Sequence, residues 1–269
     1  MRRLISFACD GRRLAGTLDE GTSPTGILIV SGGNEIRIGA HRGMAKLARD
    51  IAAKGYPVFR FDRRGIGDSD GDNKGFESSG PDIAAALSEF RSACPSVKHV
   101  IAFGNCDAAT ALLLHQPLCV DALVLANPWL IEASTDAPAP ASARAYYRQR
   151  LKDPRAWGRL FKGAVKIGRL FGSLRAASRK DVASSLSMRV ADQMTLFPVD
   201  TAILLAEHDA TAIAFKAQWN DTHFESIRAW VPLTTIDSAS HSFASDADHA
   251  ALVDAILVTL AQCPAANSA

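Results

Sequence analysis

Apolar residues along this chain gather in short runs, and stretches with helical spacing separate the runs. The segment "GILIVSGG" (26–33) is continuously apolar and ends at glycines, as is typical of a strand buried on both faces of a parallel sheet. Similar runs follow at 56–62, 97–105, 120–128, 200–207 and 232–237. Strands that alternate with helices predict an α/β fold with a mostly parallel central sheet.

Local signals predict the helices and an opening hairpin. In residues 41–55, apolar side chains recur at helical spacing and Gly55 ends the pattern, which predicts a helix. Further helices are expected over 81–93, directly after Cys106, over 212–227 and from about residue 246. Near the N-terminus, Asp10-Gly11 separates two short segments and predicts a tight turn between antiparallel strands at the edge of the sheet.

The rhythm breaks after residue 128 for some seventy residues. We therefore predict a core made of residues 1–128 and 196–269, with a helical cap inserted as residues 129–195. From Glu132 to Asp181 the chain has twelve Lys and Arg against four Asp and Glu. We favour a lid whose apolar face covers the site and whose basic face meets water. The alternative is that the basic cap contacts a membrane surface or an anionic acyl carrier.

A cysteine occupies the corner between the strand 97–105 and the following helix. The corner reads Gly104-Asn105-Cys106-Asp107-Ala108 and resembles the nucleophile elbow of α/β hydrolases, where small residues are needed because strand, turn and helix crowd together. The positive end of the helix favours the thiolate, which is the form of cysteine that attacks a carbonyl carbon. Cys106 is therefore the candidate nucleophile.

The fold predicts an acid after a later strand and a histidine after the last one. Asp209 follows the run 200–207, and His241 lies in the loop after 232–237. His241 would either hold Cys106 as a thiolate–imidazolium pair or activate it as a base, and would then pass a proton to the leaving group, while Asp209 would orient the imidazole. His208 is adjacent to Asp209, but its loop is expected to supply the acid rather than the base.

A developing oxyanion needs preorganised donors. The backbone N–H of Asp107 fits one, and Gly33 or Asn34 in "SGGNE" fits the second. Three further residues near the expected mouth are candidates for substrate binding, namely His41, Arg63 and Trp129. Asp62 and Arg64, at the end of the run 56–62, are interpreted as a structural ion-pair corner that braces neighbouring loops.

Composition narrows the classes of function. Of the 269 residues, 48% are hydrophobic and 22% charged, with a formal charge of +2, so neither a nucleic-acid partner nor a strong global field is indicated. The five cysteines are an odd number and form no CxxC pair, so they indicate neither a disulfide framework nor a zinc site. The hydrolase arrangement accounts for the His, Cys and Asp residues without a metal, and we predict no cofactor. With no signal peptide and no long apolar run, we expect a cytoplasmic protein. The pattern does not indicate an oligomeric state.

The motifs together resemble a known family. "FRFDRRGIGDSDG" (59–71) is similar to the D-x-R-G-x-G-x-S segment of α/β-hydrolase esterases. With "SGGNEIRIGAHRG", "GNCDAATA" and "AEHDATA", nearly the whole chain resembles the family called exosortase A system-associated hydrolase 1. The resemblance implies an α/β-hydrolase fold and a link to exopolysaccharide biosynthesis. The common esterase pattern has serine where this chain has Cys106.

We therefore predict a hydrolase that acts on an ester or thioester, carried by a small molecule or a carrier, through a thioacyl-enzyme on Cys106. Two alternatives stay open. An acyltransferase would pass the acyl group to a polysaccharide precursor instead of water. A noncatalytic binding protein would keep the fold and pocket without turnover.

Overall fold

The computed structural model describes residues 1–131 and 185–262. Two compact units divide the chain, one made of Met1–Leu130 and Ser187–Ala269 and the other of Ile131–Leu186. Most of the predicted cap (129–195), with the basic amphipathic stretch inside it, lies outside the described residues. The sheet and the candidate site both belong to the first unit.

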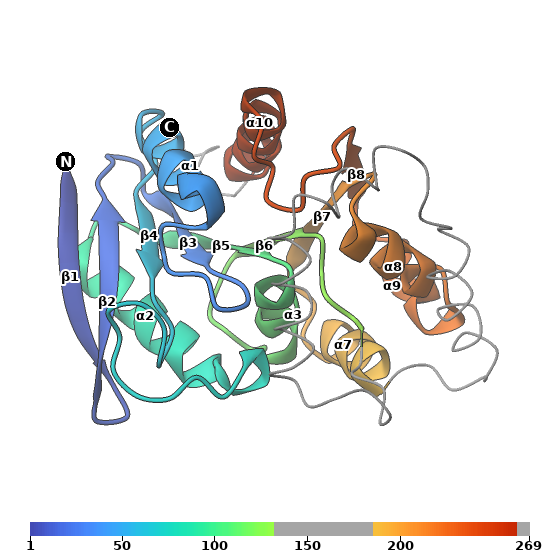
Figure 1. Ribbon diagram of the computed structural model, residues 1–269, viewed down its shortest axis with the longest axis horizontal. Helices are drawn as coiled ribbons and strands as arrows, with labels where there is room; N and C mark the ends of the chain where they lie inside the picture. The colour runs from blue at the N-terminus through green and yellow to red at the C-terminus, as the bar shows by residue number, and fades with distance from the viewer. Residues whose placement is uncertain (132–184, 263–269) are drawn as a thin grey trace, which may run out of the picture. The chain divides into compact units, whose positions relative to one another are not determined.

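The described part of this unit is built on an eight-stranded sheet (Figure 1). Its strands are β1 (Arg2–Cys9), β2 (Arg12–Asp19), β3 (Thr25–Val30), β4 (Val58–Phe61), β5 (His99–Asn105), β6 (Ala122–Ala126), β7 (Asp200–Ala206) and β8 (Leu233–Ile236). They lie in the order β1-β2-β4-β3-β5-β6-β7-β8. From β4 to β8 all neighbours are parallel, whereas β2 pairs antiparallel with both β1 and β4. The predicted α/β sheet and every predicted strand are confirmed.

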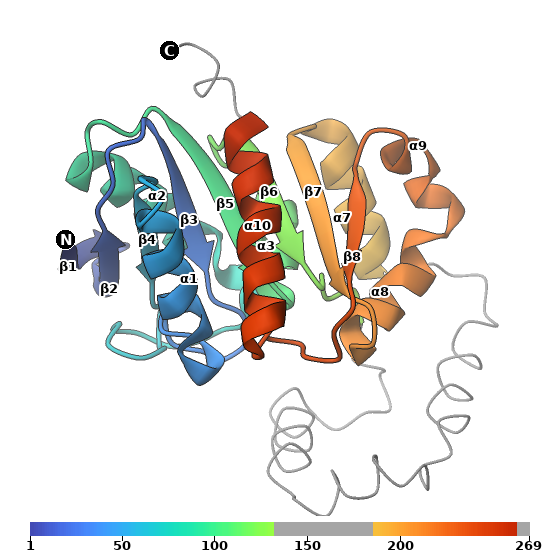
Figure 2. The same cartoon turned by 90° about the horizontal axis from the view of Figure 1, so that it is seen from above.

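Helices cover both faces of the sheet. The α-helices of the described residues are α1 (Gly43–Ala52), α2 (Gly80–Ala93), α3 (Asp107–Leu114), α7 (Ser185–Leu196), α8 (Ala210–Trp219), α9 (Glu225–Arg228) and α10 (Asp246–Gln262). Figures 1 and 2 show α1 and α10 on one face, and α2 and α3 on the other. None of the described helices combines the length and apolar composition that crossing a membrane requires.

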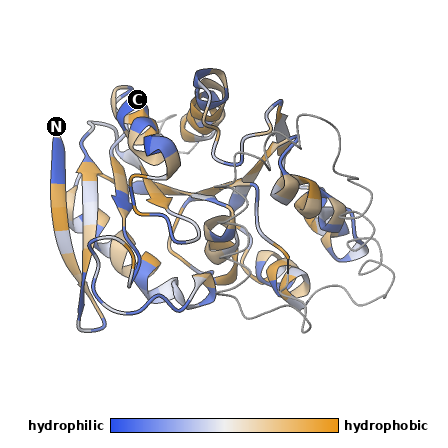
Figure 3. Ribbon diagram, viewed as in Figure 1, coloured by the Kyte–Doolittle hydropathy of each residue, from blue (hydrophilic) through white to orange (hydrophobic). Residues whose placement is uncertain are grey.

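The hydrophobic core explains why the strands read as continuous apolar runs. Every residue of β3 and β4 is buried, because helices pack on both sides of them, and Figure 3 shows the apolar colouring concentrated along the central strands. On the α1 side, Leu47 and Ile51 pack with Phe103 of β5 and Ile256 of α10 in one cluster. This packing makes the carboxyl edge of the parallel strands a rigid platform for loops.

Two local features test the finer predictions. Asp10 and Gly11 have φ angles of 47° and 71°, as the predicted hairpin turn requires, so that prediction is confirmed. The single helix expected over 212–227 is wrong, because α8 ends at Trp219 and α9 begins only at Glu225. Asp221 is extended between them, and Arg228 Nη1 donates to the carbonyls of Trp219 (2.5 Å) and Asp221 (2.9 Å), which satisfies acceptors freed by the break.

Candidate active site

Cys106 lies on a sharp turn between β5 and α3. Its backbone has φ 62° and ψ −128°, a region that residues with side chains rarely adopt. The turn is held by the Cys106 N–H, which donates to the Ala126 carbonyl of β6 at 3.0 Å. A Cβ at Gly104 would lie 2.8 Å from the backbone of Ala108 and Ala109, so glycine is required there. The elbow geometry thus places the half-buried Cys106 at the carboxyl edge of the sheet.

Asp209 and His241 meet beside this edge. His241 Nδ1 lies 2.9 Å from Asp209 Oδ2. Asp209 is 8% exposed and is the N-cap of α8, where its carboxylate accepts from the backbone N–H groups of Thr211 and Ala212 at 3.1 Å each. These bonds and the positive helix end stabilise the ionised carboxylate and hold it against the imidazole.

The side chain of Cys106 is the second group, after Asp209, that acts on the His241 ring. Burial lowers the pKa of His241, but the hydrogen bonds to Asp209 and Cys106, with the charges of both groups, outweigh it and raise the pKa to about 10. At neutral pH the imidazole therefore holds its proton next to the sulfur. The structure brings together Cys106 with two residues that lie more than a hundred positions further along the sequence.

Two asparagines that the sequence analysis did not single out hold the histidine loop. Asn105 Nδ2 donates to the His241 carbonyl at 3.0 Å, and Asn127 Nδ2 donates to the same carbonyl and to Asn105 Oδ1, at 3.2 Å each. Asn127 is fully buried, and its Oδ1 accepts from the Ala206 N–H at 2.8 Å. One side chain therefore links the ends of β6 and β7 to the histidine loop. The only sequence signal was an asparagine at or directly after the end of each of two buried strands.

The predicted oxyanion segment lies next to the elbow. Val30 of β3 is in register with Gly104 of β5, so the segments that leave the two strands start at the same level. A Cβ at Gly32 would lie 2.9 Å from Asp107 Oδ1 and 3.5 Å from the Cys106 Cβ. The Gly33 N–H donates to Asp107 Oδ1 at 2.6 Å. In this structure the side chain of Asp107 thus occupies a donor that we expected an oxyanion to use.

The three candidate substrate-binding residues lie around this segment in different ways. Arg63 is buried and donates from Nη2 to the Gly33 carbonyl at 2.5 Å. The Trp129 N–H donates to the Cys106 carbonyl at 3.2 Å, which places Trp129 beside the elbow. His41 is exposed, with φ 53°, in a short 3₁₀ turn just before α1.

The corner residues Asp62 and Arg64 brace loops, as expected. Asp62 is fully buried; it pairs with the Arg37 guanidinium and accepts from the Asp68 N–H at 3.0 Å. Arg64 pairs with Asp82 at 2.5 Å. These contacts tie the loop after β4 to the loop after β3 and to α2.

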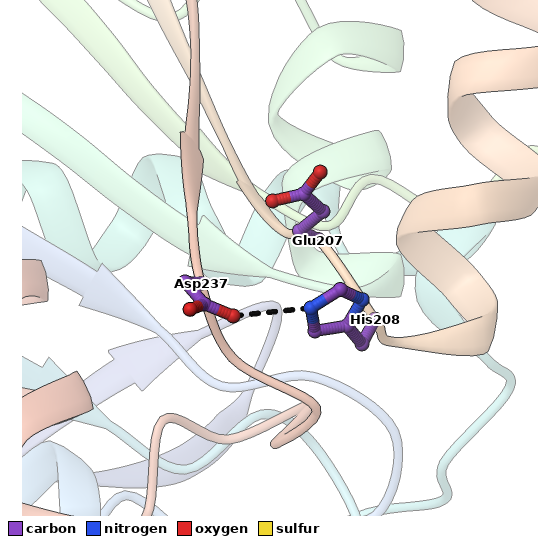
Figure 4. Close-up of side chains that lie close together, drawn as sticks. All are labelled: Glu207, His208 and Asp237. Atoms are coloured by element: carbon purple, nitrogen blue, oxygen red, sulfur yellow. Dashed lines mark hydrogen bonds and ion pairs between the residues drawn. The ribbon is translucent and has the colours of Figure 1, made fainter.

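His208 pairs with a different acid from the one that His241 contacts. Its Nε2 lies 3.0 Å from Asp237 Oδ1, and Glu207 completes an exposed cluster (Figure 4). Among the described residues, these three side chains bring potential metal-ligand atoms within 4.8 Å of one another. All three are exposed, and such surface clusters are common without a metal, so we assign none.

With this geometry in place, comparison with known proteins is informative. A family model described as "Serine aminopeptidase, S33" matches residues 24–166, which is more than half of the chain. The chain belongs to this hydrolase family. The residues matched by the family model include β3, the elbow and β6. A comparison with curated proteins found no match.

Solved structures agree on the fold of this family member. An esterase of Pyrococcus furiosus is 12% identical with a TM-score of 0.67, covering 97% of this chain and 90% of that one. The α/β hydrolase GrgF from a Penicillium species is 17% identical with a TM-score of 0.66, covering 98% and 99%. A thioesterase domain from the curacin biosynthetic pathway is 14% identical with a TM-score of 0.58, covering 96% and 98%. The chain therefore has the α/β-hydrolase fold.

Proposed function

We propose that this protein is a cysteine-nucleophile hydrolase that cleaves an ester or thioester through a thioacyl-enzyme. One observation carries the proposal: Cys106 stands on a strained elbow and its side chain acts on the ring of His241, which the buried Asp209 orients through a hydrogen bond of 2.9 Å. The likeness in fold to an esterase and to a thioesterase domain is compatible with it.

In acylation, the Cys106 thiolate attacks the acyl carbon and forms the S–C bond. The resulting oxyanion is received by the Asp107 N–H and by a donor of the Gly33–Asn34 segment, so the substrate oxygen must compete with the Asp107 carboxylate for the Gly33 N–H. As the C–O or C–S bond to the leaving group breaks, His241 transfers its proton to the departing alkoxide or thiolate. Asp209 stabilises the imidazolium before this transfer.

In deacylation, the now neutral His241 takes a proton from water, whose oxygen attacks the thioacyl carbon. The C–S bond breaks, the acid is released, and the sulfur leaves as thiolate beside the imidazolium. The free enzyme is thus restored. An acceptor hydroxyl in place of water would make the same sequence an acyl transfer.

We also propose the biological setting in which this protein acts. The resemblance of "SGGNEIRIGAHRG" and "GNCDAATA" to the exosortase A system-associated hydrolases supports a link to exopolysaccharide biosynthesis. The basic residues between 132 and 181 favour an acyl group delivered on an anionic carrier. The described cysteines are free thiols, which is compatible with a reducing cytoplasm.

The decisive experiment traps the intermediate. The full-length protein is incubated with p-nitrophenyl and thioester acyl donors of several chain lengths, quenched in acid, and digested for peptide mass spectrometry. We expect an acyl mass on the peptide that contains Cys106, together with stoichiometric alkylation of the same thiol by iodoacetamide near neutral pH.

Matched variants separate the site from background reactivity. Cys106→Ala and His241→Ala should abolish the adduct, whereas Cys119→Ser removes an exposed free thiol and His208→Ala an exposed imidazole, and both should leave the adduct unchanged. Equal, slow alkylation of Cys106 in the wild type and in His241→Ala, with no turnover of any donor, would instead support a noncatalytic binding protein.

A further inference from the structure

Two residues that line a polar cavity of about 290 Å³ also hydrogen-bond with the predicted oxyanion segment. The walls of the cavity come from the β1–β2 turn, the loop after β4 and the first turns of α2. Two hydrogen bonds join it to the segment: Arg63 Nη2 donates to the Gly33 carbonyl at 2.5 Å, and Asn73 Nδ2 donates to Asn34 Oδ1 at 2.8 Å. We call it the Arg63 cavity.

The charges that line the Arg63 cavity are unevenly matched. The lining cations are Arg12, Arg63, Arg64 and Lys74, and the lining acids are Asp10, Asp72 and Asp82. Arg64 takes up two of the acids, since it pairs with Asp82 at 2.5 Å and with Asp10 at 3.1 Å. Among the lining residues, only the exposed Asp72 is left to face the other three cations.

Arg63 is the unusual member of this set. It is 4% exposed, and within the described residues it has no ion pair. Nη2 is used by the Gly33 carbonyl, but Nη1 is buried and has no hydrogen-bond partner among the described residues. A buried guanidinium normally faces a carboxylate or phosphate, because removing its charge from water is costly unless an anion compensates. Arg63 thus brings to the cavity wall a buried charge that no acid of the described residues compensates.

We propose that the Arg63 cavity is an anion subsite that receives a carboxylate or phosphate group of the acyl substrate. The planar guanidinium matches either oxyanion, and Lys74 and Arg12 at the exposed side supply further positive charge. The proposal rests on the proposed function only in assigning the anion to the substrate that Cys106 attacks. The cavity itself binds anions whether or not turnover occurs.

Binding is tested without catalysis. Inorganic phosphate and, separately, succinate are titrated into the full-length protein by calorimetry, and the tighter ligand identifies which oxyanion the cavity takes. We expect about tenfold weaker binding of that ligand in Arg63→Gln, because a charge-assisted hydrogen bond is lost. Lys74→Ala, a change at the rim of the cavity, should weaken it about threefold. Arg13→Ala removes a nearby exposed cation outside the cavity and should bind as the wild type does.

Turnover gives the second readout. We expect the ratio of kcat/KM for mono-p-nitrophenyl succinate to that for p-nitrophenyl butyrate to fall about tenfold in Arg63→Gln. No binding of either anion by the wild type, or equal binding by the wild type, Arg63→Gln and Lys74→Ala, would overturn the subsite. If neither ester is turned over but phosphate or succinate binding still depends on Arg63, the subsite stands and the proposed hydrolase activity fails.

Discussion

Asn127 donates a hydrogen bond from Nδ2 to the backbone carbonyl of His241, at 3.2 Å, although 114 positions separate the two residues. Asn105 donates to the same carbonyl. The imidazole of the candidate site is thus positioned at its backbone by two amide side chains and at its ring by Asp209. Precise placement of a base depends on such supporting contacts.

Asn127→Ala tests this support. It removes the Nδ2 donor and leaves the buried Ala206 N–H without its acceptor, so we expect a loss of about 1–3 kcal/mol in the free energy of unfolding. If Asn127 has only a structural role, this loss of stability is the only effect of the substitution. A positioning role also lowers the rate constant for alkylation of Cys106 and shifts its pH profile, measured on folded protein. Asn127→Asp keeps the shape of the side chain but removes the Nδ2 donor. It therefore separates the effect of the lost hydrogen bonds from the effect of the lost side-chain volume.

The elbow predicts a strict limit on side-chain size at residue 104. In Gly104→Ala the new methyl group would press on the backbone of Ala108 and Ala109, so we expect destabilisation of about 1–3 kcal/mol and slower alkylation of Cys106. Ala108→Gly is the control, since it removes a buried methyl group without adding one, and should cost about 1–2 kcal/mol through helix propensity and lost burial. Denaturant unfolding of both variants measures the difference. Equal stability of Gly104→Ala and the wild type would contradict the crowding.

Protonation of His241 predicts how stability depends on pH. Its pKa is raised from 6.5 to about 10 in the folded chain, so between these values the folded state binds more protons than the unfolded state. The contribution to stability is therefore complete below about pH 6.5 and is lost as the pH rises through about 10. Denaturant titrations across this range should show the decline, and His241→Gln should remove that part of the slope. If the difference in the free energy of unfolding between the wild type and His241→Gln does not change with pH, the pKa of His241 is not raised.

Asp107 competes with the substrate for the Gly33 N–H. Asp107→Ala frees this donor, so we expect acylation by an activated ester to become faster by about threefold to tenfold, measured as a pre-steady-state burst. Stability should fall by about 1 kcal/mol, because one hydrogen bond and one acid at the start of α3 are lost. Slower acylation would show that Asp107 orders the Gly33 segment rather than occluding it.

The sequence predicted the elements whose signals are local. The hairpin at Asp10-Gly11 and the buried strands follow from residue type and periodicity, and the corner at Gly104–Ala108 follows from small residues between a strand and a helix. The break after Trp219 was missed because the helical pattern continues through it and the compensating Arg228 contacts are tertiary.

The site was only partly predictable for the same reason. Candidate residues can be placed after strands by their order in the chain, but the hydrogen bond between Gly33 and Asp107 depends on a register between strands that no local pattern encodes. The roles of Asn105 and Asn127 likewise exist only once distant loops meet. The charge interactions between residues that meet only in the folded chain cannot be predicted from the amino-acid composition.

The register of Val30 with Gly104 limits how this protein can vary in length. An insertion or deletion of one residue at Ser31 or Gly32 would carry the Gly33 amide past the thiol, because β3 is anchored on both sides and cannot slide to compensate. Length changes between homologues should therefore be absent from this short stretch and be found instead in loops such as the one between α8 and α9.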